Sequence, residues 1–460
     1  MSMELSDMSD IFPICKGTLL ASRYKVQAFL GEGSFGKVAK CVDIVNDTKM
    51  AVKIIKDKPY FTQRALEEIK ILQQLQTLDE DKCSLVRWNG LFFHERFICL
   101  KFELLDLSLY DYMKQRSFQP LCISEVRPVI HQLTTALLHL EALEIMHADL
   151  KPDNIMVVDR RQEVLQVKII DFGLARHVSD AVPGSCVQSL WYRAPEVMLG
   201  LVFMEPIDMW SLGLVAAEIA LGFPLFPGSH EYDMMKFIVE TLGQPPDYLL
   251  NSGQNSTRFF CIEGNYNKQT WKLKTPELFA RQTGHYYKDT RLFHFCSLDT
   301  LEEGMCFGNK AEQNELRNFV DLLKKMLLVD KNRRIIPLQV LEHPFFSVEQ
   351  HAHSSQSIND KNLMVDMEEA EAYVSQQLSS QETSVHSFAL CDVASMTMTP
   401  HMETVFIHPE NVSAKLEDEA AGIQPEVTVK TNKRGGGVKE FFKSMRRTVV
   451  SWFHREDKMP

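Results

Sequence analysis

Two short polar segments constrain the fold of this chain more than any other feature. Residues 147–154 read HADLKPDN and residues 171–173 read DFG, and the first aspartates of the two segments lie 22 positions apart (171 − 149). Together they supply an Asp, a Lys, an Asn and a second Asp, which are the groups that transfer of a phosphoryl group needs. Either segment alone often arises by chance, but the two in this order do not. The chain must therefore fold so that both segments meet at one site.

Each of these polar residues has a candidate chemical role. Asp149 is the candidate to position a substrate hydroxyl and accept its proton, and Lys151 is the candidate to lie beside the transferring phosphate. Asn154 and Asp171 are candidate Mg²⁺ ligands, because oxygen donors suit this hard cation.

A glycine-rich segment precedes them and is the candidate cradle for phosphates. It follows a predicted strand and consists of Gly31, Glu32, Gly33, Ser34, Phe35, Gly36, Lys37 and Val38. Glycines let the backbone approach phosphates, and Val38 offers a branched apolar face to a base. A dinucleotide-binding fold uses the same glycine spacing, but there a helix follows the loop. Here Phe35 adds bulk at the turn and the text after it remains strand-like, which disfavours that alternative.

The next strand carries Ala51 and Lys53, and a helix after it carries adjacent glutamates. A strand Lys paired with a helix Glu is the arrangement that orients the Lys on nucleotide phosphates. Of Glu67 and Glu68 we favour Glu68, because Ile71 and Leu72 share its helical face.

The segment at Phe102 is the candidate base-binding region. Phe102 is predicted to line the back of the pocket, a role compatible with its being a plain core residue. Glu103, Leu104 and Leu105 form the connection that follows, and their backbone N–H and C=O groups are predicted to read the adenine edge.

The composition excludes several classes of protein. Of the 460 residues, 45% are hydrophobic and 24% are charged, and the net charge of −11 argues against direct nucleic-acid binding. The ten cysteines show no CxxC and no paired spacing, so we expect reduced thiols in an intracellular protein. The acidic start MSMELSDMSD is not typical of a signal peptide, and no run of 18 apolar residues predicts a membrane span.

The organisation along the chain predicts an α+β, bilobal domain. After a short leader at 1–22, a strand-rich lobe at 23–105 precedes a larger helical lobe at 106–347. A helix is predicted over 63–78, with Leu66, Ile69, Leu72 and Leu75 at helical spacing. Residues 348–429 are rich in Ser and acidic residues and are predicted to be mostly disordered.

Three further residues have predicted structural roles. Glu196, in the APE tripeptide 194–196, is predicted to be a buried carboxylate that needs a cation. Arg334 is the candidate and Arg333 the alternative. Asp208 and Trp210 are predicted to lie on a helix that supports the catalytic loop from below.

The combined motifs resemble the CMGC group of protein kinases and, within it, the homeodomain-interacting protein kinases. The text that carries the resemblance is HADLKPDNIMVVD, VQSLWYRAPEVMLG, LGQPPDYLLNSGQNSTRFF, WKLKTPELFARQTG and IPLQVLEHPFF. It spans about residues 20–347 and implies a protein kinase domain at 23–347. Lys151, two positions after Asp149, is the pattern of serine/threonine kinases.

The resemblance implies ATP- and Mg²⁺-dependent phosphorylation of Ser or Thr in protein substrates, usually before Pro. It also implies transcription regulators as partners, a role in transcriptional or stress signalling, and residence in the nucleus, the cytoplasm or both. The alternatives are a pseudokinase-like scaffold and an adaptor whose kinase domain is incidental. Since Lys53, Glu68, Asp149, Lys151, Asn154 and Asp171 are all present, the enzyme is favoured.

The activation segment departs from the family pattern. Cys186 stands where relatives carry a Tyr, and Leu190 stands where they carry an Arg. Ala148, which is typical of the family, already replaces the Arg that many kinases use to hold a phosphate. A phosphotyrosine would need a nearby cation. We therefore hypothesise that activation-loop tyrosine phosphorylation does not switch this chain on; the alternative is drift in a weakly active relative.

Residues 430–460 form a basic amphipathic tail. Lys430 to Lys458 holds nine Lys and Arg against three acids, about +6. Aromatic and apolar residues of 438–453 lie along one predicted helical face. Such a segment suits an anionic membrane, a calmodulin-like groove, or the chain's own acidic kinase domain. A nuclear-import role for the Lys433–Arg434 region is a weaker alternative.

Overall fold

The computed structural model describes residues 12–265, 268–305 and 310–347, all of which belong to one compact unit of the chain. The predictions for most of the leader, for 348–429 and for the basic tail fall outside the described residues. None of the helices in the described ranges is long and apolar enough to cross a membrane.

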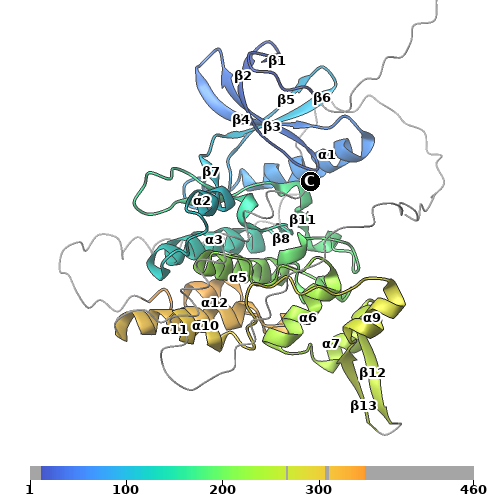
Figure 1. The fold of residues 1–460 in the computed structure, drawn as a ribbon. Coiled ribbons are helices and arrows are strands. Elements are labelled where there is room, and N and C mark those ends of the chain that lie inside the picture. Colours follow the sequence, from blue (N-terminus) through green and yellow to red (C-terminus); the bar gives the residue numbers. More distant parts are fainter. Residues whose placement is uncertain (1–11, 266–267, 306–309, 348–460) are drawn as a thin grey trace, which may run out of the picture. The chain divides into compact units, whose positions relative to one another are not determined.

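The first lobe is built on an antiparallel sheet in the order β1-β2-β3-β4-β6-β5 (Figure 1). Its strands are β1 Leu19–Leu20, β2 Tyr24–Glu32, β3 Gly36–Asp43, β4 Thr48–Ile55, β5 Trp88–His94 and β6 Phe97–Glu103. Alternate residues such as Val26, Cys41 and Val52 form the core on one face, as period-2 patterning predicts. Phe12, from the leader, packs edge-to-face on Phe97 with a centroid separation of 5.4 Å.

The helix of this lobe, α1, runs from Pro59 to Leu75, so it begins and ends earlier than predicted. Pro59 at its first position explains the start, because a proline there loses no hydrogen bond. Of the four apolar residues at helical spacing, Leu66 is 45% exposed, and Ala65 is buried in its place. Three residues turn a helix by about 300°, which is about 60° less than a full turn. A series with strict i+3 spacing therefore rotates around the helix, and its first member, Leu66, lies off the buried face.

The second lobe is mainly helical and is centred on α5 (Pro206–Leu221), in which every residue from Ile207 onward is buried. α3 (Ile123–Ala142) packs against α5 and α12. The other helices are α2 Leu109–Gln115, α4 Pro195–Met198, α6 Glu231–Leu242, α7 Asp247–Ser252, α8 Ser256–Phe259, α9 Pro276–Thr283, α10 Asp299–Met305, α11 Lys310–Met326 and α12 Pro337–Leu341. Because α5 is apolar on all of its faces, other elements must cover every side of it, which explains its central place (Figure 1).

A hairpin inside the helical lobe was not predicted. β12 (Phe260–Asn265) pairs antiparallel with β13 (Lys268–Leu273) and projects away from the helices in Figure 1. It lies between α8 and α9 and joins two of the segments that carry the family resemblance, residues 242–260 and 271–284.

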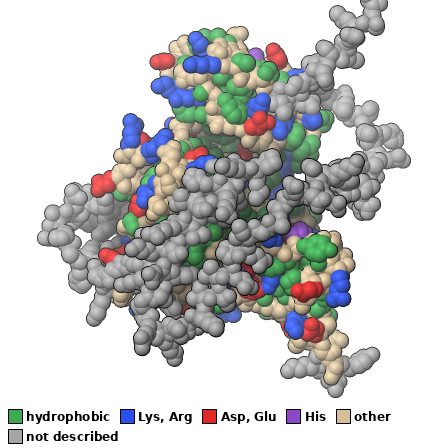
Figure 2. Space-filling model, viewed as in Figure 1, with side chains coloured by type: hydrophobic (Ala, Val, Ile, Leu, Met, Phe, Trp, Pro, Cys, Tyr) green, Lys and Arg blue, Asp and Glu red, His purple; other side chains and the backbone are tan. Residues whose placement is uncertain are grey.

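Short strands connect the lobes and bear the loops of interest. They are β7 Leu107–Ser108, β8 Ile145–Met146, β9 Ile155–Val157, β10 Val167–Ile169 and β11 Arg176–His177. Leu85 forms a parallel bridge with Ile169, which ties the first lobe to the strand before the DFG tripeptide. On the face shown in Figure 2, side chains of both charge signs surround the sheet-rich lobe.

Candidate active site

The catalytic loop is held from below by a buried carboxylate. Asp208, near the start of α5, accepts hydrogen bonds from the backbone N–H groups of His147 at 2.6 Å and Ala148 at 2.9 Å. Burial raises the pKa of Asp208. The charge of His147 and the two backbone N–H donors act in the opposite direction and lower it. Ala148 adopts a left-handed φ of 61°, which is costly for a non-glycine residue, so the Asp208 bonds offset local strain. The helix that carries Asp208 therefore supports this loop, as the sequence predicts.

Asp149 is fixed on both of its oxygens. Its Oδ2 accepts a hydrogen bond from Asn154 Nδ2 at 2.9 Å and forms an ion pair with Lys151 Nζ at 3.0 Å. Its Oδ1 accepts from the backbone N–H of Ser189 at 3.0 Å and from the Ser189 hydroxyl at 2.7 Å. A carboxylate held in this way has one orientation, as a proton acceptor needs.

Ser189 is a site residue that the sequence did not single out. Its hydroxyl donates to Asp149 and accepts from Lys151 Nζ at 2.8 Å, so it links the two candidate catalytic side chains. In the sequence, Ser189 is simply a hydroxyl residue between Gln188 and the WYRAPE text. Its residue type and position alone do not predict a contact with Asp149. The link becomes visible only when the activation segment is folded onto the catalytic loop.

The candidate metal ligands lie on either side of this cluster. Both N–H groups of Asn154 are directed at Asp149, at its backbone carbonyl and its carboxylate, which leaves the amide oxygen as the candidate donor. Asp171 has a left-handed backbone (φ 62°) and its side chain is 36% exposed. Within the described ranges no three His, Cys, Asp or Glu side chains gather into a metal cluster. Two protein oxygens suit Mg²⁺, which keeps waters and binds substrate phosphates.

A triad of two buried side chains, Lys53 and Glu68, and the partly exposed Asp171 joins the two lobes. Lys53 Nζ lies 2.7 Å from Glu68 Oε1 and 2.8 Å from Asp171 Oδ1. Burial of Lys53 disfavours its charged form, but the two carboxylates outweigh that effect and raise its pKa. Burial likewise opposes ionisation of Asp171, yet Lys53 lowers the Asp171 pKa overall. The structure thus selects Glu68 over Glu67, whose carboxylate binds Arg64 instead.

The glycine-rich segment is shorter as a loop than predicted, because Gly31 and Glu32 still belong to β2 and Gly36 begins β3. A Cβ on Gly36 would lie 2.1 Å from the Ile54 carbonyl oxygen, so the sheet itself requires glycine there. A Cβ on Gly31 or Gly33 would meet nothing within 4 Å. The fold therefore gives no packing reason for those two glycines, whereas close approach of a phosphate does.

Phe35, at the tip of this loop, folds inward. Its ring lies 5.6 Å from Lys53 Nζ, and a Cβ on Gly173 would be 3.2 Å from its edge. Ser34 is exposed and Lys37 is partly buried. Val38 is opposite Lys53 in the β3–β4 register. The loop thus covers the Lys53–Asp171 pair.

Substitution of Gly36, which the sheet packing requires, and of Gly33, which it does not, should affect stability and ATP binding differently. We expect Gly36→Ala to lower the melting temperature, since the clash with Ile54 costs about 1–3 kcal/mol. Gly33→Ala should leave the melting temperature near wild type and raise the KM for ATP. Thermal denaturation and ATP titration of both variants test this. An equal loss of stability in both would contradict the assignment of Gly33 to phosphate binding.

The candidate base-binding segment follows β6. Phe102 is opposite Ala51 in the β4–β6 register, which places the two predicted pocket residues side by side. The Glu103 carboxylate is held by Lys168 Nζ at 2.8 Å and by the Arg87 N–H at 2.7 Å. Within the described residues, the N–H of Leu105 has no backbone partner. Any recognition of a base edge here would use the backbone.

The buried Glu196 carboxylate is paired with Arg334. Two bonds of 2.6 and 2.9 Å join the side chains, and Arg334 also donates to the Pro206 carbonyl. Arg333, the alternative partner, is exposed. This pair fixes the end of the activation segment to the helical lobe.

Comparison with known proteins agrees with this geometry. The model of the protein kinase domain matches residues 24–346. The chain belongs to the protein kinase family. Its kinase domain is further placed with the homeodomain-interacting protein kinases: it is 42% identical over 355 residues to homeodomain-interacting protein kinase 1 of Mus musculus, across 76% of this chain and 29% of that protein.

Two further relatives give the same grouping. Homeodomain-interacting protein kinase 2 of Mesocricetus auratus is 42% identical over 76% of this chain and 30% of its own length. Homeodomain-interacting protein kinase 4 of Homo sapiens is 37% identical over 71% of this chain and 55% of its own length. The kinase domain is therefore what these proteins share, and the chain spans only part of each relative.

Proposed function

We propose that the chain transfers the γ-phosphate of ATP to Ser and Thr hydroxyls of proteins. The observation that carries this proposal is the continuous set of contacts from Glu68 through Lys53 to Asp171, beside the Asp149–Lys151–Asn154 cluster. All the groups that phosphoryl transfer requires are present and mutually oriented.

Each group then has one task. Lys53, held by Glu68, positions the nucleotide phosphates. Asn154 and Asp171 would hold Mg²⁺, which neutralises phosphate charge when bound. Lys151 lies where it offsets charge on the transferring group, and Asp149 accepts the proton of the attacking hydroxyl.

The test is transfer of phosphate from Mg·ATP by the full chain to a library of Ser- and Thr-containing peptides. Transfer that requires Mg²⁺ supports the proposal. Nucleotide binding without transfer to any peptide would favour a pseudokinase-like scaffold, the alternative function.

We further propose that the acceptor is followed by Pro, for a reason that lies in Gln188. This residue is left-handed (φ 65°), and its carbonyl accepts a hydrogen bond from Arg193 Nη2 at 2.8 Å. Its neighbour Ser189 contacts Asp149, so the residue after a bound acceptor must pass this loop. The backbone N–H of that residue cannot use the Gln188 carbonyl as an acceptor, because Arg193 already donates to it. Proline, which has no N–H, loses nothing there.

A peptide series tests this reason directly. We expect Ser-Pro and Ser-(N-methyl-Ala) peptides to have similar kcat/KM values, and Ser-Ala to be lower by roughly 5- to 100-fold. An unsatisfied N–H costs about 1–3 kcal/mol, which sets that range. If N-methyl-Ala behaves like Ala, the missing N–H is not the determinant and the proposal for Gln188 fails.

Activation without phosphotyrosine is also proposed, and the contacts of the activation segment support it. The Gln188 N–H donates to the Ala148 carbonyl at 2.9 Å, and its side-chain amide donates to Ile207 and Ser211 in α5. Arg193 is engaged by two carbonyls and by Glu231. The segment is thus held by amide, carbonyl and carboxylate groups of the chain and by no phosphate, while Cys186 is exposed.

We therefore expect treatment of the purified chain with a tyrosine phosphatase to leave its activity within about twofold of the untreated value, since no phosphate contributes to these contacts. A control kinase that needs phosphotyrosine should lose activity in the same assay. Stoichiometric phosphotyrosine at 172–196 that is required for activity would contradict the hypothesis.

For partners and location we propose the classes that the resemblance implies. The relatives' names describe them as homeodomain-interacting, and transcription regulators of that class are the proposed substrates here. Nuclear residence, alone or with a cytoplasmic pool, follows from the same proposal. Fractionation of cells that express the chain tests it.

A further inference from the structure

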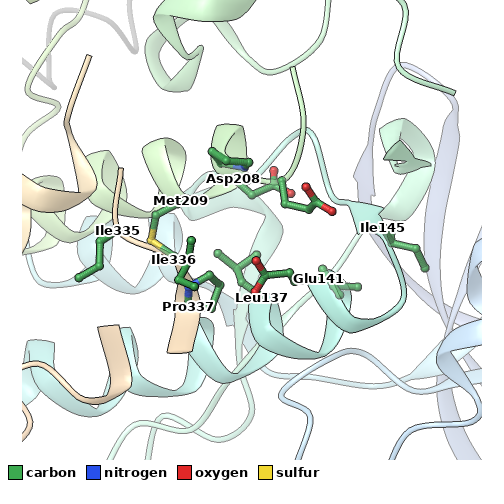
Figure 3. Close-up of a pocket in the computed structure, with 11 residues that line it drawn as sticks. Leu137, Glu141, Ile145, Asp208, Met209, Ile335, Ile336 and Pro337 are labelled. Carbon is green, nitrogen blue, oxygen red and sulfur yellow. The ribbon is translucent and has the colours of Figure 1, made fainter. Parts of the chain in front are cut away.

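A small apolar recess lies on the helical lobe between α3, the start of α5 and the residues that lead into α12 (Figure 3). Its floor comes from apolar side chains of all three segments, among them Leu137, Leu140, Met209, Ile335 and Pro337. Ile336, at its edge, is 40% exposed. The recess is separate from the candidate active site, yet it shares one residue with the support of that site, because Asp208 also lines it.

Two acids line the same recess and have no cationic partner in the described part of the chain. They are Glu141 on α3 and Glu205, which immediately precedes α5. Burial, and to a lesser extent the charge of Glu205, raise the pKa of Glu141. Glu141 also lies in the last turn of α3, where the helix dipole disfavours an acid. No cation among the described residues pairs with Glu141 to offset these costs, and such conflicts commonly mark functional positions.

The ligand that suits this recess is an apolar side chain flanked by cations. We propose that it is the docking site of the chain's own basic segment 438–453, VKEFFKSMRRTVVSWF. In that segment Met445 is followed directly by Arg446 and Arg447. The apolar residue would contact the apolar lining, and the two cations match the charges of Glu141 and Glu205.

Charge and reach both favour this occupant. Residues 430–458 carry about +6 by formal charge, whereas residues 1–347, which contain the recess, carry 39 Lys and Arg against 44 Asp and Glu, about −5. Ninety residues separate Ser347 from Val438 (438 − 347 − 1). A flexible chain of that length has an end-to-end distance of roughly 50–60 Å, enough to reach any part of a domain of this size. Tethering also raises the local concentration of the segment, which assists a weak contact.

Docking there would act on the catalytic loop through Asp208. That residue borders the recess and binds the backbone of His147 and Ala148. An occupied recess restricts the start of α5 and so stabilises the loop that bears Asp149. Asp208 is in this respect a positioning residue.

The test is hydrogen–deuterium exchange on the full chain. We expect peptides from 438–453 to exchange roughly tenfold more slowly in wild type than in Glu141→Lys, because the substitution repels the basic segment. The fold should tolerate it, since a cation in the last turn of α3 favours the helix. Glu163→Lys, an exposed acid elsewhere on the domain, is the matched control and should change nothing.

A charge swap makes the result specific. Protection lost in Glu141→Lys should return when Arg446→Glu and Arg447→Glu are added, whereas those two substitutions alone should abolish it. Equal exchange of 438–453 in wild type and Glu141→Lys would overturn the proposal. So would binding to phosphatidylserine vesicles or to Ca²⁺–calmodulin that is equally strong in both, since a docked segment must compete with these ligands.

Discussion

Asp149→Asn is expected to lower kcat by roughly 10²- to 10⁴-fold, the usual contribution of a positioned proton acceptor. Asparagine has the same shape and can keep a hydrogen bond to Ser189, so the fold and the KM for ATP should change little. The measurement is the initial rate of phosphate transfer from Mg·ATP to a Ser-Pro peptide, together with the melting temperature of the variant.

Asp159→Asn is the matched control for this experiment. It is the same chemical change ten positions further on. Among the described residues, the Asp159 carboxylate hydrogen-bonds only to the exposed Arg161 side chain and its backbone N–H. Its activity should stay within about twofold of wild type, as is usual for the loss of a surface ion pair. Retention of full activity in Asp149→Asn would remove the proposed role of this residue.

Arg334→Ala should produce the largest loss of stability. Arg334 and Glu196 are 0% and 1% exposed, so removal of the cation leaves a buried carboxylate without its partner. Breaking such a pair costs about 3–5 kcal/mol. For a domain of this size the melting temperature should fall by roughly 5–15 °C.

Two variants make the interpretation of that loss specific. Arg333→Ala removes an adjacent but exposed cation and should shift the melting temperature by no more than about 2 °C. The double variant Arg334→Met with Glu196→Leu should recover much of the loss, because two apolar side chains leave no unpaired charge. If Arg333→Ala is as destabilising as Arg334→Ala, the loss does not come from the Glu196 pair.

The sequence predicted the fold well where chemistry fixes spacing. Lys53 and Glu68, which are 15 residues apart, and Asp171, which lies 118 residues beyond Lys53, converge as expected. Glu196 and Arg334, 138 positions apart, do so as well. In each case a charged residue in an apolar context requires a partner, so the pattern itself carries three-dimensional information.

Other features depend on packing that no local pattern records. Leu66 is apolar and near helical spacing, but the direction of α1 against the sheet exposes it. The β12–β13 hairpin has partly exposed strands without clear alternation, so its pairing was invisible in the sequence. The role of Ser189 depends on how the activation segment lies on Asp149. That contact spans 40 residues and uses a hydroxyl, the least distinctive of the polar groups.

The attachment of the activation segment without a phosphate has a consequence for control at the level of the cell. Gln188 and Arg193 hold the segment through amide and carbonyl groups, which no phosphatase removes. Under the proposed function, such an enzyme is competent as soon as it has folded, and its output scales with the number of molecules present. Synthesis, degradation and confinement to a compartment then set the strength of the signal.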